Sequence, residues 1–104
     1  MLDSSLVFVD LETTGANPAF DRVIEVGIVK VSGGRIEYEW STLVDPETSI
    51  PPLIQGFTGI SNEMVRGAPP VAKVMREAAD FVGEHPLAAH NASFDRRFWD
   101  AELA

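Results

Sequence analysis

The sequence contains no cysteine. This absence excludes disulfide bonds and thiolate metal sites, and it suits a reducing compartment, so we expect a cytoplasmic protein. Long hydrophobic runs are also missing. No apolar stretch approaches the roughly 20 residues that span a bilayer, and the first residues lack the basic and then apolar order of a signal peptide. No membrane partner is expected.

Positive charge is scarce. The chain has 8 Lys and Arg against 16 Asp and Glu, which gives a formal net charge of −8. A passive nucleic-acid-binding protein usually has a basic surface, so this class is disfavoured. An enzyme that meets phosphates through divalent cations held by acidic side chains is not excluded. With 104 residues, 45% of them hydrophobic, the chain is long enough for one globular domain and too short for two.

The stretch FVDLETTG, residues 8–15, places two carboxylates at the end of a predicted strand. Side chains alternate between the two faces of a strand, so Asp10 and Glu12 share a face with Leu6 and Phe8. Both faces are apolar up to Asp10. This pattern predicts a central strand that is covered on both sides.

Two carboxylates on one face need a reason. The Cα atoms of Asp10 and Glu12 should lie about 6 to 7 Å apart, and two anions beside apolar residues repel unless a cation is supplied. Oxygen ligands of this kind suit Mg²⁺ or Mn²⁺. The alternative is a strand that simply reaches water, with both acids solvated, and for a D-x-E pattern taken alone that interpretation is the better one.

A turn with two hydroxyls follows the acids. Thr13, Thr14 and Gly15 combine polar side chains with an unhindered backbone that could offer N–H groups to a phosphate or sugar. The Gly, Asn and Pro residues that continue through Pro18 are equally typical of an ordinary loop. Taken alone, this turn favours the ordinary loop.

The rest of the chain indicates one α/β unit. Apolar residues predict a second strand over 23–31 and a third over 36–44, joined by a Gly-Gly turn at 32–35 that is typical of tight antiparallel hairpins. A proline-rich connection follows. Ser61 is expected to cap a short turn that runs through Val65.

A longer helix is predicted after Pro69 and Pro70, because proline suits the first turn of a helix. Gly83 is expected to end it. Apolar residues recur there at three- and four-residue spacing and predict a buried stripe made of Val71, Val74, Met75, Ala78, Phe81 and Val82.

The end of the chain predicts a short buried strand over 87–90 and then another helix beginning at 91–93. Asp95 falls in the first turn of this helix, where the helix dipole favours a carboxylate. Capping and catalysis are equally good local interpretations of Asp95. Phe94 fits the core and a nucleotide contact equally well.

Three motifs, taken in order, resemble the DEDD-type 3′–5′ exonucleases: FVDLETTG at 8–15, FTGISNEM at 57–64 and HNASFD at 90–95. The pattern is similar to the epsilon proofreading subunit of bacterial DNA polymerase III, with ribonuclease T in the wider group. A lone D-x-E is weak evidence, whereas the first and last motifs together are specific. The resemblance implies a ribonuclease H-like α/β fold: a mixed sheet with three antiparallel strands, then helix, strand and helix.

The resemblance also implies an activity, the removal of nucleotides from the 3′ ends of single-stranded DNA or RNA, with DNA favoured and a DNA polymerase as a possible partner. By this likeness Asp10 would bridge two Mg²⁺ or Mn²⁺ ions, Glu12 would complete the ligands of the ion that activates water, and Asp95 would serve the second ion. The implied substrate contacts are Thr13, Thr14, Gly15, Thr58, His90, Asn91 and Phe94.

The sequence departs from the family pattern in two places. Thr58 stands where epsilon-like relatives have histidine, which affects substrate contacts rather than metal chemistry. The family's third motif, with a final Asp ligand and a general base, has no counterpart before Ala104, and neither His85 nor His90 matches that base. We therefore expect the N-terminal portion of a longer exonuclease domain, with little or no hydrolysis by itself and an exposed apolar surface that favours self-association.

Two alternatives come from other classes. A haloacid-dehalogenase-type phosphatase also begins with a strand that ends in paired acids, but its second acid is normally Asp and its downstream Lys and Asp cluster are missing here. A non-catalytic remnant could bind protein or nucleic acid through the same fold. Such a module would not need Asp10, Glu12 and Asp95.

Overall fold

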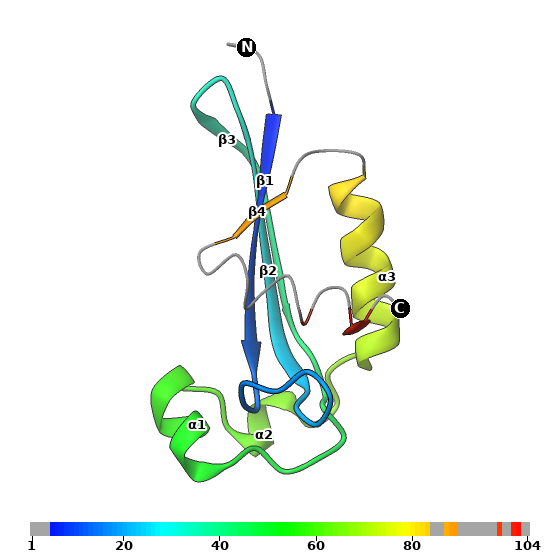
Figure 1. The fold of residues 1–104 in the computed structure, drawn as a ribbon. Helices are drawn as coiled ribbons and strands as arrows, with labels where there is room; N and C mark the ends of the chain where they lie inside the picture. Colours follow the sequence, from blue (N-terminus) through cyan, green and yellow to red (C-terminus); the bar gives the residue numbers. More distant parts are fainter. Residues whose placement is uncertain (1–4, 84–86, 90–97, 99–100, 103–104) are drawn as a thin grey trace.

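The computed structural model describes residues 5–83, 87–89, 98, 101 and 102. Its centre is a four-stranded sheet in the order β3-β2-β1-β4 (Figure 1). The strands are β1 (Ser5–Thr13), β2 (Val23–Ser32), β3 (Arg35–Leu43) and β4 (Leu87–Ala89). The first three form an antiparallel meander, and β4 pairs with β1 in parallel. This mixed sheet has the predicted α/β arrangement.

The hairpin between β2 and β3 shows why the register is fixed. Ser32 pairs with Arg35, so Gly33 and Gly34 alone form the loop. Their φ angles are 59° and 77°, and a two-residue turn with two positive φ angles matches the twist of the flanking strands. The Gly-Gly turn is therefore confirmed.

Three helices connect the meander to β4: α1 (Pro52–Thr58), α2 (Asn62–Val65) and α3 (Val71–Val82). The Ser61 hydroxyl accepts a hydrogen bond from the N–H of Met64 at 3.2 Å, which confirms the predicted cap. The predicted end of α3 at Gly83 is also confirmed. None of the helices within the described ranges is long and apolar enough to cross a membrane.

The main core lies between α3 and one face of the sheet. Four residues of the predicted stripe are buried: Val74, Met75, Ala78 and Val82. They pack with the strand residues Val7, Val9, Leu11, Val26 and Ile28 and with Phe98 from the end of the chain. The Phe81 ring stacks on Trp40 with a centroid distance of 6.2 Å. A smaller core consists of Ile24, at the start of β2, together with Ile50, Ile60 and Val65.

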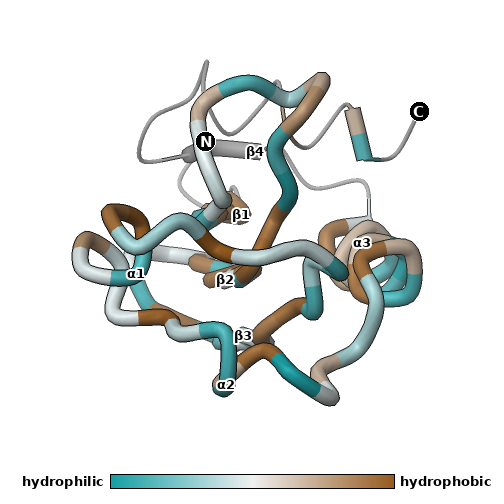
Figure 2. The backbone as a smooth tube through the Cα atoms, turned by 90° about the horizontal axis from the view of Figure 1, so that it is seen from below, coloured by the Kyte–Doolittle hydropathy of each residue, from teal (hydrophilic) through white to brown (hydrophobic). Residues whose placement is uncertain are grey.

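The opposite face of the sheet corrects one prediction. β1 is central, as expected, but Leu6 is 39% exposed and Phe8 is 42% exposed. Seen along the sheet, α3 lies on one side of the strands, while α1 lies on the other side at their end (Figure 2). Apolar residues on both faces of a strand show that it is central; they do not show that both faces are covered in this chain. The exposed face, called the open face below, carries Leu6, Phe8, Asp10 and Glu12.

Candidate functional site

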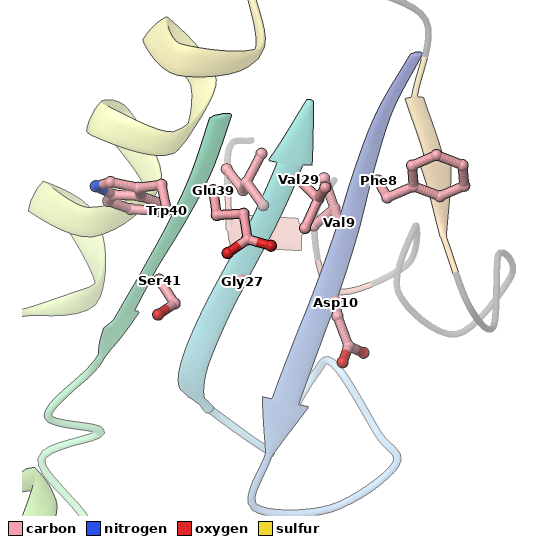
Figure 3. A pocket seen from close by; sticks show the side chains of 9 residues that line it. Phe8, Val9, Asp10, Gly27, Val29, Glu39, Trp40 and Ser41 are labelled. Atoms are coloured by element: carbon pink, nitrogen blue, oxygen red, sulfur yellow. The ribbon is translucent and has the colours of Figure 1, made fainter. Parts of the chain in front are cut away.

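Asp10 lies on the open face, and its side chain is exposed. In the sheet register it stands opposite Gly27, which stands opposite Ser41. A shallow hollow on this face is lined by these three residues together with Phe8 and Glu39, among others. Figure 3 shows Asp10 at the edge of this hollow, extending away from α3. Because Gly27 has no side chain, the Asp10 carboxylate remains accessible from the side of β2.

Glu12 stands directly opposite Glu25 of β2, and both side chains are half-buried. Like charges directly opposite each other destabilise a sheet. Glu25 is thus a candidate site residue that was not predicted from the sequence. The one visible signal was an acidic residue within the largely apolar β2. The oxygen donors of Asp10 and Glu12 are the type that Mg²⁺ and Mn²⁺ prefer, so they fit a divalent cation. Within the described part of the chain, no three Asp, Glu or His side chains group closely enough to hold a metal ion.

The segment after β1 folds back on itself and uses the polar groups of both threonines. The side chains of Thr13 and Thr14 are buried. The Thr13 hydroxyl donates to the Gly15 carbonyl at 2.5 Å. The Thr14 N–H donates to the Arg22 carbonyl at 2.8 Å, and the Thr14 hydroxyl accepts from the Arg22 N–H at 2.9 Å. Thr14 therefore offers a substrate neither its N–H nor a free hydroxyl, and the backbone near Gly15 is the better candidate for contact.

Thr58 has a similar local task at the end of α1. Its hydroxyl donates to the Ile54 carbonyl at 2.8 Å and accepts from the Ile60 N–H at 3.1 Å. The following Gly59 adopts a left-handed conformation with a φ of 78° and closes the helix. Both α1 and the 14–22 loop lie at the end of the sheet where β1 finishes (Figure 1). Thr58 is therefore near this end, with its hydroxyl used in capping.

The remaining predicted site residues lie outside the described residues: His90, Asn91, Phe94 and Asp95. The structure does give the point from which they follow. Ala89, the last residue of β4, pairs with Val9, one residue before Asp10. Asp95, the third ligand that the resemblance implies, therefore follows in sequence after β4, and β4 ends beside Val9, the neighbour of Asp10.

Glu102 is a further acid near the loop. Burial raises the pKa of its carboxyl above the ordinary value, while the positive charge of Arg22 and a hydrogen bond with the Val23 backbone act in the opposite direction. Because the folded chain holds this proton more tightly than the unfolded chain, the carboxyl lowers stability as the pH rises through the raised pKa.

We expect Glu102→Gln to raise the melting temperature slightly at pH 7. The gain should vanish below about pH 4, where glutamate is largely protonated in both states. Thermal unfolding followed by circular dichroism across this pH range measures the effect. Glu77→Gln on α3, which is exposed and changes the charge equally, is the control. A gain that persists at low pH, or that Glu77→Gln reproduces, would contradict the desolvation of Glu102.

The sheet, with its paired acids at the end of a central strand, defines an exonuclease-type α/β fold. A structure of exonuclease I with bound product superimposes with a TM-score of 0.80 over 93% of this chain and 24% of that one, at 19% identity. A structure of exonuclease X in complex with 5′ overhanging duplex DNA gives a TM-score of 0.78 at 33% identity, over 89% of this chain and 52% of that one.

The sequence comparisons agree with the fold. The family model described as an exonuclease of the ribonuclease T type matches residues 7–104, so the chain belongs to this DEDD-type exonuclease family. The chain is 43% identical over 96 residues to a PolC-type DNA polymerase III from Clostridium perfringens and 38% identical over 96 residues to that of Bacillus subtilis. Each alignment covers 92% of this chain but only 7% of the polymerase. The chain is an exonuclease domain sequence, and the family generally uses divalent metal ions.

Proposed function

We propose that this chain acts in the removal of nucleotides from the 3′ ends of single-stranded nucleic acid, with DNA as the favoured substrate. The observation that carries the proposal is the position of Asp10 and Glu12. Both lie on the open face at the end of the central strand, beside the loop over residues 14–22. An exposed carboxylate and a half-buried one on the same strand face of an exonuclease domain suit cation-dependent phosphodiester hydrolysis.

In this proposal Asp10 and Glu12 hold two divalent cations, Mg²⁺ or Mn²⁺, with Asp95 as a further ligand. The bound cations would supply an activated water and neutralise charge on the phosphate. The backbone near Gly15 orients the terminal nucleotide, and Phe94 packs against its base. His90, Asn91 and Thr58 complete the substrate contacts. The half-buried Glu25 opposite Glu12 adds negative potential that favours cations at this end of the sheet.

The partner in this proposal is a single-stranded 3′ end, presented in the cytoplasm and in some settings by a DNA polymerase. The PolC-type relatives are polymerases, and the exonuclease X structure was determined with DNA, which supports DNA over RNA. The exposed Leu6 and Phe8 keep self-association as a second proposed interaction.

A single-turnover assay tests the proposal. The chain, in excess over a 5′-labelled single-stranded oligothymidylate, is incubated with Mn²⁺, because a slow reaction is enough for detection. We expect products shortened one nucleotide at a time from the 3′ end, with no reaction after chelation. A 3′-phosphorylated oligonucleotide serves as the blocked control. Internal cleavage, or shortening that continues after chelation, would contradict the proposal. Absence of any detectable Mn²⁺ affinity would favour a non-catalytic module.

A further inference from the structure

The loop after β1 is organised around the carboxylate of Asp21. One oxygen of this carboxylate accepts a hydrogen bond from the Thr14 hydroxyl at 3.2 Å, and the other accepts from the Asn17 N–H at 2.9 Å. The Asp21 N–H in turn donates to the Asn17 carbonyl at 2.7 Å. Asp21 is thus bonded to two points of the loop that precede it by seven and four residues.

Gly15 packs directly against the same carboxylate. A Cβ atom placed on Gly15 would lie 2.5 Å and 2.7 Å from the two carboxylate oxygens of Asp21. Atoms this close cannot coexist, so any side chain at position 15 would have to displace the carboxylate. The glycine is needed here for close approach, and the Asp21 carboxylate fixes where the Gly15 backbone lies.

Hydrogen bonds also join the two ends of the loop, next to the strands that flank it. Thr14 exchanges two hydrogen bonds with the backbone of Arg22, one residue before β2 begins. At the other end, a register shift falls between Glu12 and Thr13. The segment that Asp21 organises therefore follows immediately after the carboxylates of Asp10 and Glu12.

We propose that Asp21 is a positioning residue that fixes the Gly15 backbone to receive the 3′-terminal nucleotide. The inference rests on the proposed function and adds a residue to its site. A loop containing Gly, Asn and Pro would otherwise have to be ordered when substrate binds, at a cost in affinity. Hydrogen bonds to the Asp21 carboxylate order it beforehand. Asp21 itself contacts neither the cations nor the nucleotide.

The test compares Asp21→Asn with the wild-type chain in three measurements. Thymidine 5′-monophosphate, the product expected from an oligothymidylate, is titrated in the presence of Mn²⁺; Mn²⁺ is titrated alone; and amide hydrogen exchange is followed at Asn17. Since hydrogen bonds to a charged group are among the strong ones, we expect exchange at Asn17 to accelerate about tenfold and nucleotide affinity to fall about tenfold. Mn²⁺ affinity should stay within about twofold. Asp80→Asn, an exposed site on α3, makes the same change in charge and should alter none of these.

A second set of variants keeps the test independent of any loss of folding in Asp21→Asn. Gly15→Ala should weaken nucleotide binding because its methyl group collides with the Asp21 carboxylate. In the Asp21→Ala background the carboxylate is absent and the collision with it is removed, so Gly15→Ala should lower the nucleotide affinity much less. Such non-additivity is expected only for residues in contact.

The outcomes separate the two claims. Unchanged nucleotide affinity in a folded Asp21→Asn chain, or additive effects of the two substitutions, would overturn the positioning role while leaving the proposed function intact. If the wild-type chain binds neither Mn²⁺ nor the nucleotide, the proposed function is wrong, and so is the positioning role of Asp21. An amide exchange rate at Asn17 that is the same in Asp21→Asn as in the wild type would overturn the claim that this carboxylate orders the loop.

Discussion

Asp10→Asn lowers the affinity of the chain for Mn²⁺ by at least about 100-fold, since even groups that only support a metal ligand typically contribute 10- to 100-fold. Asparagine keeps the size and one oxygen of the side chain but removes the negative charge that a hard cation needs. The loss is measured by titrating Mn²⁺ and following the free ion by electron paramagnetic resonance.

Glu39→Gln is the matched control for this prediction. Glu39 is exposed, lines the same hollow as Asp10 and loses the same charge on substitution. Its Mn²⁺ affinity should stay within about twofold of the wild type, because screened charges outside a ligand shell contribute little. Equal losses in the two variants would show that Mn²⁺ responds to the net charge of −8 rather than to a site at Asp10.

Ile28→Ala lowers the free energy of unfolding by about 2 to 5 kcal/mol, the usual range for a buried isoleucine, because it leaves a cavity under α3. Ile28 is 1% exposed and packs in the main core. Ile36 of β3 pairs with Val31, which pairs with Leu6, so the register places Ile36 on the open face, where it is 61% exposed. Ile36→Ala should therefore change the free energy of unfolding by less than about 1 kcal/mol. Urea denaturation of the two variants measures both. Similar losses at the two positions would mean that the open face is covered in solution.

The elements with strong hydrophobic periodicity were predictable from the sequence. β2, α3 and the Gly-Gly hairpin are present where expected because burial pattern, turn chemistry and caps agree there. α1 was missed. Its Leu53 and Phe57 are 80% and 86% exposed, so the helix has no buried stripe for periodicity to reveal, and the prolines before it indicate a connection. Proline in the first turn is nevertheless compatible with a helix.

The site could be predicted only in part. The alternation of side chains placed Asp10 and Glu12 on one face, and the register confirms that both stand opposite residues of the β2 strand on that face. The hydrogen bonds of Asp21 and the pairing of Glu25 with Glu12 did not follow from any spacing. They depend on a loop that folds back and on a strand register, and both are tertiary features. The backbone around Thr13 and Thr14 was expected to contact a substrate; in the folded loop the Thr14 N–H and hydroxyl are both hydrogen-bonded to the backbone of Arg22.

β4 pairs Val7 with Leu87, 80 positions later in the chain, whereas the meander from β1 to β3 joins near neighbours. Contacts between distant positions carry the greatest loop-closure cost and tend to form late in folding. During synthesis, the acidic end of β1 is therefore complete long before the parallel strand can dock beside it. The meander therefore pairs early and β4 last, so Asp10 and Glu12 reach their final surroundings only when the parallel strand is in place.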